Sequence, residues 1–121
     1  MRYGRIMCGE AVWAERAERA VSFRERTLGL LGRDALGSGA ALLIERCGAV
    51  HTVGMRFALD VVFLDRACRV ARVVRGVRPG RLMVWGGWRA ASVLESEAGR
   101  ADLSRLAAGQ EMRWENVSEK G

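Results

Sequence analysis

Three side chains in this sequence, His51, Asp60 and Glu95, have the strongest potential for chemistry. An imidazole and a carboxylate can exchange protons with a substrate near neutral pH, so these residues could form a general acid–base set. Asp60 directly precedes the apolar run Val61–Leu64, and Glu95 follows the apolar stretch from Ala90. If the two strand ends meet, both carboxylates could converge on His51. The interpretation that we favour is that Asp60 orders a turn by accepting hydrogen bonds from the backbone or from Arg56.

Cys47 and His51 raise two further chemical possibilities. Their spacing of four would allow metal chelation on a helix, but Gly48 and Gly54 disfavour a helix, and His51 is the only histidine. Two ligands are too few for a structural zinc site, so we predict no metal. A nucleophilic Cys47–His51 pair would also need a lowered thiol pKa and an oxyanion hole, which the sequence does not reveal.

No complete catalytic set emerges, and a binding or interaction module is the preferred interpretation. Trp85-Gly86-Gly87-Trp88 places two indoles beside flexible glycines, which could form a stacking surface or a lid over the sheet. No GxGxxG, P-loop or GxSxG motif is present, so no cofactor is expected. We expect a small polar ligand or a protein as partner. The candidate binding residues are His51, Thr52, Met55, Arg56, Asp60, Trp88 and Glu95.

A hydrolase-like enzyme that uses His51 with Asp60 or Glu95 remains the first alternative. Nucleic-acid binding is the second, because the net charge is +6 and nearly all of the positive charge is arginine. The arginines are scattered from Arg2 to Arg113, without a run of five basic residues. This pattern disfavours nucleic acid as a partner.

Cysteine content and hydropathy bear on the compartment. The three cysteines are odd in number and form no CxxC pair, which favours reduced thiols in the cytoplasm. The first eight residues lack an apolar stretch of signal-peptide length, and no window approaches the roughly 18 apolar residues of a membrane span. We expect a monomeric cytoplasmic protein without a transmembrane segment.

The local patterns predict an α+β domain, β-rich, with a mostly antiparallel, partly closed sheet or barrel. Ser22-Phe23-Arg24-Glu25 is a capping box and predicts the main helix, which should end near Leu31 before Gly32. A second, short helix is expected over Asp102–Ala107. Apolar runs, alternation and turn signals predict strands at Ile6–Trp13, Ala40–Ile44, Val61–Leu64, Arg69–Val74, Ala90–Glu95 and Glu111–Val117.

Several blocks in this order resemble the domain of unknown function 192 family. The central block, His51–Asp65, resembles the family's pairing of a Met with a P-L-D-[VI]-[VI]-F-[LI]-D strand. Arg26–Arg33 resembles its R-x-x-G-L-M-x-R helix, and Val93–Gly99 its V-L-E-x-x-A-G element. Ala58 replaces the usual proline and Gln110 the usual aspartate. The resemblance implies one β-rich α+β domain, here over residues 4–117, and no assigned reaction.

Overall fold

The computed structural model describes residues 2–22 and 29–117. Within these ranges the chain forms nine strands and one three-residue 3-10 helix. The strands are β1 (Arg2–Cys8), β2 (Ala11–Ala20), β3 (Ala40–Glu45), β4 (Ala49–Val50), β5 (Leu59–Leu64), β6 (Val70–Val77), β7 (Val84–Trp85), β8 (Ser92–Glu97) and β9 (Met112–Asn116), and the 3-10 helix η1 is Leu103–Arg105.

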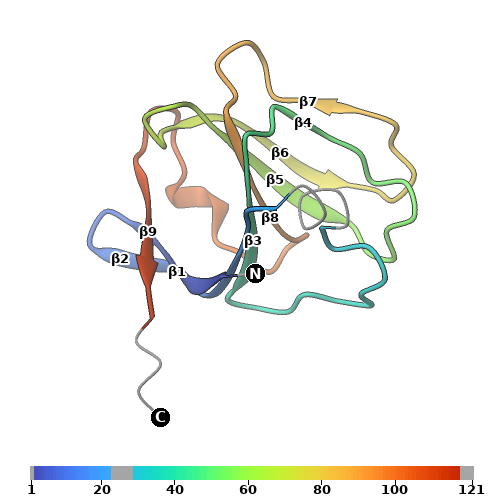
Figure 1. The fold of residues 1–121 in the computed structure, drawn as a ribbon, viewed down its shortest axis with the longest axis horizontal. Coiled ribbons are helices and arrows are strands. Elements are labelled where there is room, and N and C mark those ends of the chain that lie inside the picture. The colour runs from blue at the N-terminus through green and yellow to red at the C-terminus, as the bar shows by residue number, and fades with distance from the viewer. Residues whose placement is uncertain (1, 23–28, 118–121) are drawn as a thin grey trace.

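Seven strands form one mixed sheet in the order β6-β5-β8-β3-β2-β1-β9 (Figure 1). All neighbours are antiparallel except β2 and β3, which run parallel with Arg16 opposite Ala40. A parallel pair needs a long connection, and the chain between Ala20 and Ala40 provides it. The sheet does not close into the predicted barrel, because the described parts of its edge strands β6 and β9 meet only near an isolated bridge between Arg69 and Glu111.

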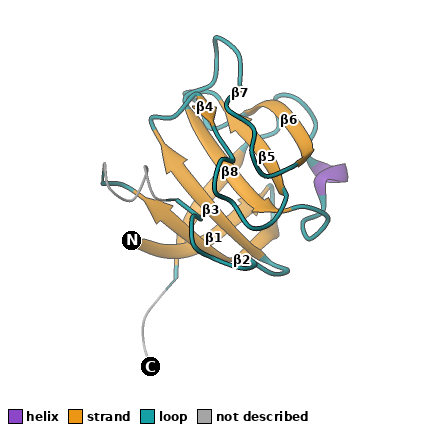
Figure 2. Ribbon diagram, turned by 90° about the vertical axis from the view of Figure 1, so that its right-hand side faces the viewer, coloured by secondary structure: helices purple, strands orange, loops and turns teal. Residues whose placement is uncertain are grey.

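Both faces of the central strands are buried, which explains why β5 is apolar at consecutive positions. Leu59, Val61 and Phe63 belong to one core cluster, while Val62 and Leu64 belong to the other. Successive side chains of a strand point to opposite faces, so this alternation assigns each cluster to one side of the sheet. β4 and β7 form a separate two-stranded sheet, which Figures 1 and 2 both place beside β5, β6 and β8.

The predicted α+β class is wrong, because the described residues contain no α-helix. Most of the expected main helix, residues 23–28, lies outside the described ranges. Its expected last turn, from Gly29 to Gly32, is instead a turn in which both of these glycines have positive φ angles. That conformation ends a helix instead of continuing it. The short helix predicted over Asp102–Ala107 is only the 3-10 turn η1.

The first predicted strand, Ile6–Trp13, is instead the tip of a hairpin. Gly9 has a φ of +62° and lies in the two-residue connection between Cys8 and Ala11, which face each other across β1 and β2. A glycine with positive φ is what a two-residue hairpin turn requires. The apolar residues on its two sides therefore belong to two strands and not to one.

Candidate functional site

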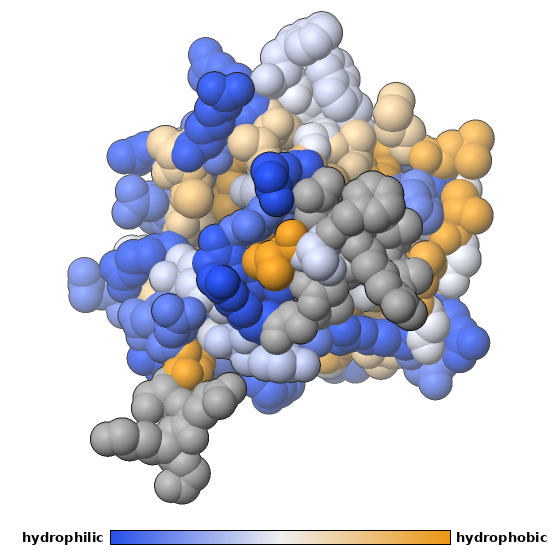
Figure 3. Space-filling view, viewed as in Figure 1, coloured by the Kyte–Doolittle hydropathy of each residue, from blue (hydrophilic) through white to orange (hydrophobic). Residues whose placement is uncertain are grey.

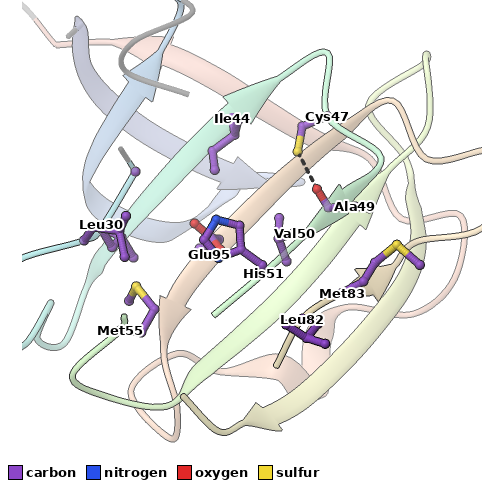
Figure 4. Close-up of a pocket in the computed structure, with 12 residues that line it drawn as sticks. Leu30, Ile44, Cys47, Ala49, Val50, His51, Met55, Leu82, Met83 and Glu95 are labelled. Carbon is purple, nitrogen blue, oxygen red and sulfur yellow. Dashed lines mark hydrogen bonds between the residues drawn. The ribbon is translucent and has the colours of Figure 1, made fainter. Parts of the chain in front are cut away.

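A cavity of about 380 Å³ lies over the face of the sheet that carries Phe63 and Val93. Figure 4 shows side chains from β3, β8 and the segments around β4 and β7 converging on it. Most of the lining is apolar. The lining residues are Gly29, Leu30, Leu31, Ile44, Cys47, Ala49, Val50, His51, Met55, Leu82, Met83 and Glu95.

Glu95 is the acidic group of this cavity. It lies on β8, flanked by Leu42 of β3 and Val61 of β5, so its backbone is fixed in the middle of the sheet. The residue is only 5% exposed, and no described residue donates a hydrogen bond to its carboxyl group or forms an ion pair with it. Burial raises the pKa of Glu95 to about 7, because the apolar surroundings disfavour the charged form.

His51 and Met55 line the same cavity as Glu95. His51 directly follows β4 and is exposed, whereas Met55 is buried in the core cluster below the cavity. In Figure 4 the imidazole lies in front of the Glu95 carboxyl group, although no direct hydrogen bond joins the two side chains where the chain is described. Cys47 also borders the cavity, and its thiol donates to the carbonyl of Ala49 at 3.0 Å. A proton-exchanging carboxyl, an imidazole and a thiol thus share one apolar cavity.

Thr52 points into the protein and connects two loops. Its hydroxyl donates to the carbonyl of Arg78 at 2.7 Å and accepts from the amide of Arg81 at 2.9 Å. Its backbone amide donates to the carbonyl of Arg81, and its carbonyl accepts from Gly80. These bonds hold the loop that carries His51 against the loop that leads to Leu82 and β7. Thr52 therefore supports the cavity wall without lining it.

Asp60 lies on the opposite side of the sheet from the cavity. Its carboxylate accepts the amide of Gly76 at 2.8 Å and that of Gly99 at 3.0 Å. The pairing of β5 with β6 is irregular here, since Leu59 faces Val77 while Val61 faces Val74. Gly76 occupies this bulge with a φ of +62°. Asp60 satisfies the amide that the bulge leaves without a ladder partner.

Arg56 and Trp88 also lie away from the cavity. Arg56 is exposed and forms an ion pair with Asp34 at 2.7 Å, not with Asp60. Trp88 is 94% exposed and contacts Trp85 edge to face, with 5.2 Å between the ring centroids. The convergence of His51, Asp60 and Glu95, which the sequence offered only as a possibility, does not occur, because Asp60 binds backbone amides on the other side of the sheet. His51, Met55 and Glu95 do share the cavity.

Sequence reasoning overlooked Leu82 and Met83, which line the cavity although they are largely exposed. The sequence did hold a signal for them, because Leu82 and Met83 are two adjacent large apolar residues in a glycine-rich loop, between Arg81 and Val84. The described ranges, the cavity included, hold no group of three or more His, Cys, Asp and Glu that could bind a metal. No helix in those ranges is long and apolar enough to cross a membrane. No disulfide joins Cys8, Cys47 or Cys68.

Solved structures of two other proteins share this fold. One is a protein of unknown function from Novosphingobium aromaticivorans DSM 12444, with a TM-score of 0.78 and 20% identity over 93% of this chain and 84% of that chain. The other is a "putative transcription regulator" from Sinorhizobium meliloti 1021, with a TM-score of 0.76 and 19% identity over 94% of this chain and 96% of that chain. At these identities the likeness concerns the fold alone.

No curated protein matches the chain. The resemblance read from the His51–Asp65 block and its neighbours is nevertheless confirmed. The model of the DUF192 family, described as "Uncharacterized ACR", matches residues 8–114, and the chain belongs to this family.

Proposed function

We propose that this chain is a binding module, folded as one domain over residues 4–117, whose cavity takes a small molecule. The ligand has an apolar body and one basic or hydrogen-bond-donating group. The observation that carries the proposal is the Glu95 carboxyl group, buried in the wall of a mostly apolar cavity without a hydrogen-bond donor among the described residues. A cavity of about 380 Å³ is within the size range of small-molecule sites.

The chemistry of the cavity defines the class of ligand. Apolar walls such as Leu30, Ile44 and Met55 favour burial of an apolar body. A buried polar group without a partner costs free energy, which a ligand's N–H group would recover by donating to Glu95. A protonated amine would add charge–charge attraction and lower the pKa of Glu95 again. His51 at the exposed rim offers a second polar contact.

A matched series of probes tests this proposal. Benzylamine and cyclohexylamine are titrated into the protein by calorimetry, beside benzyl alcohol and cyclohexanol of similar shape. We expect the amines to bind more tightly than the alcohols, and Glu95→Gln to remove that preference. Glu111→Gln, an exposed carboxylate outside the cavity, is the control and should retain it. Equal binding of amines and alcohols by the unmodified protein would overturn the proposal.

The pH dependence gives a second test of the same site. The amines stay protonated up to about pH 9, whereas Glu95, with a pKa of about 7, ionises between pH 6 and pH 8. If the carboxylate is the form that binds, amine affinity should rise about ten-fold over this interval. Glu95→Gln should show no such rise.

Hydrolysis with His51 and Glu95 is the second candidate function. A carboxyl group with a pKa near 7 beside an imidazole and the Cys47 thiol is an arrangement that supports acid–base or nucleophilic chemistry. Asp60 has no part in it, because its carboxylate lies across the sheet. If the unmodified protein hydrolyses p-nitrophenyl acetate and both His51→Ala and Glu95→Gln abolish this turnover, the hydrolase hypothesis is supported. If the unmodified protein hydrolyses p-nitrophenyl acetate no faster than buffer alone, this ester chemistry is excluded.

A further inference from the structure

One segment of the chain is strongly basic. Between Asp65 and Glu95 no acidic residue occurs, and seven arginines fall in that interval. Six of them recur at every third residue, and the complete set is Arg66, Arg69, Arg72, Arg75, Arg78, Arg81 and Arg89. Seven of the 19 arginines therefore lie on β6 and on the segments that flank it, without an acidic residue among them.

The structure leaves several of these arginines available to an outside partner. Arg69 contacts Glu111 at 4.0 Å and the carbonyl of Gly109, and Arg72 donates to the carbonyl of Trp85 at 2.9 Å. Arg78, Arg81 and Arg89 are exposed, and no acidic side chain among the described residues pairs with them. Their charge is therefore directed to solvent.

The same segment also exposes large apolar side chains. Leu82 is 85% exposed, Met83 64% and Trp88 94%, and Trp85 packs its ring against Trp88. Figure 3 shows hydrophobic side chains along the right-hand edge of the molecule, the edge where Figure 1 places the connection from β6 to β7. Leu82 and Met83 are adjacent, and Trp85 contacts Trp88, so the segment presents two apolar pairs to solvent, which is a feature of interaction surfaces.

The exposed side chains stand on a fixed support. Val84 between them is buried in the core, and β7 pairs with β4. The amide of Gly86 donates to the carbonyl of Gly48 at 2.9 Å. Gly86 packs so closely that a Cβ there would lie 2.3 Å from Cδ1 of Phe63. The apolar residues are thus held outward by the fold.

We propose that the segment from Arg78 to Arg89 is a membrane-contact surface that binds the headgroup region of an anionic lipid bilayer. Tryptophan favours the headgroup level, where its ring meets both apolar and wet surroundings. Aliphatic side chains such as Leu82 and Met83 can enter the acyl boundary, while arginines attract anionic lipid phosphates. A single-stranded nucleic acid would find only the tryptophans to stack on, because Leu82 and Met83 have no aromatic face.

Vesicle binding tests this proposal with the full chain. The protein is mixed with vesicles of phosphatidylcholine alone, or of phosphatidylcholine with about 30% phosphatidylserine, and the bound fraction is measured by flotation. We expect binding to the anionic vesicles only, a blue shift of tryptophan fluorescence on binding, and loss of binding at high salt. Equal binding to both vesicle types, or no binding to either, would overturn the proposal.

Matched variants assign the binding to the segment. Arg78→Gln with Arg81→Gln should lower the partition coefficient about twenty-five-fold, since each arginine contributes roughly five-fold at an anionic surface. Leu82→Ser with Met83→Ser should lower it at least ten-fold. The control pair, Arg2→Gln with Arg113→Gln, removes the same charge from strands β1 and β9 and should retain most of the binding.

Two results would overturn the assignment. One is an equal loss of vesicle binding in the control pair, which would indicate that net charge alone is responsible. The other is tight, salt-dependent binding of a single-stranded oligonucleotide that depends on Trp85 and Trp88, with no binding to anionic vesicles. Circular dichroism melting of each variant shows that the fold is retained, so that a loss of binding reports on the surface itself.

Discussion

Asp60 and Glu95 lie on paired strands, one register position apart, with their carboxyl groups on opposite faces of the sheet. Glu95 faces Val61 and Asp60 faces Ser96 across β5 and β8. Neighbouring residues of a strand point to opposite sides, so Asp60 meets the amides of Gly76 and Gly99 while Glu95 meets the cavity. The Asp60 carboxylate thus has hydrogen-bond donors, whereas the Glu95 carboxyl group is buried in an apolar wall without a donor among the described residues.

The pKa of Glu95 makes the stability of the protein depend on pH. In the folded state the pKa is about 7, whereas an unfolded chain has a value near 4.3, so the folded protein binds the proton more tightly. The associated stability is fully present below about pH 4 and is lost as pH rises through about 7, by roughly 4 kcal/mol in total. Urea unfolding of the unmodified protein and Glu95→Gln at pH 5 and pH 8 measures this.

The comparison between those two proteins isolates Glu95 from other carboxylates. Hydrogen bonds lower the pKa values of Glu97 and Asp102, and their contributions occur in both proteins and cancel. We expect Glu95→Gln to gain stability relative to the unmodified protein between pH 5 and pH 8. A difference that does not change with pH would show that Glu95 ionises as easily in the folded state as in the unfolded chain.

Replacing Asp60 should cost stability, whereas replacing His51 should not. Asp60→Ala leaves two backbone amides without an acceptor, so we expect a loss of about 2–4 kcal/mol in the free energy of unfolding. His51 is exposed, and His51→Ala should change stability by less than about 0.5 kcal/mol. Chemical denaturation measures both variants, with the exposed Asp34→Asn as control. A loss of several kcal/mol in His51→Ala would make His51 a packing residue.

Thr52 should behave as a structural residue of the cavity loop. Thr52→Val preserves its shape but removes the hydroxyl that joins Arg78 and Arg81, so we expect a loss of about 1–3 kcal/mol. Thr52→Ser retains the hydroxyl and should recover most of the stability. Thermal unfolding measures the melting temperatures of the two variants. Equal melting temperatures would mean that the hydroxyl has no stabilising role.

Local patterns predicted the elements that depend on short-range signals. The apolar run Val61–Leu64 forms the last four residues of β5, and Asp65–Cys68 does form the turn to β6, where Cys68 adopts a φ of +59°. The α+β assignment failed where it can be tested: the predicted last turn of the main helix, Gly29–Gly32, is a turn with two glycines of positive φ, and the predicted short helix is only the 3-10 turn η1.

The candidate site was predictable only in part, because strand register decides which side chains meet. His51 and Glu95 were selected by chemical type, and both border the cavity. The face of the sheet on which Asp60 lies could not be foreseen, since a shift of one residue in the pairing of β5 with β8 would exchange the two faces. That pairing joins residues that are 28 to 38 positions apart in the sequence, and local sequence does not fix it.

The contact between Gly86 and Phe63 provides the last test, because it connects the buried core to the exposed tryptophans. A Cβ at position 86 would lie 2.3 Å from Cδ1 of Phe63 and 2.7 Å from Cβ of Ala90, and Phe63 is fully buried. Gly86→Ala should therefore destabilise the protein by about 1–3 kcal/mol through overpacking. Phe63→Leu should be destabilising alone but should relieve the clash, so a double-mutant cycle should show favourable coupling of at least about 0.5 kcal/mol. Additive losses would mean that the loop from Trp85 to Trp88 can shift away from Phe63, and the tryptophans would then not be held by the core.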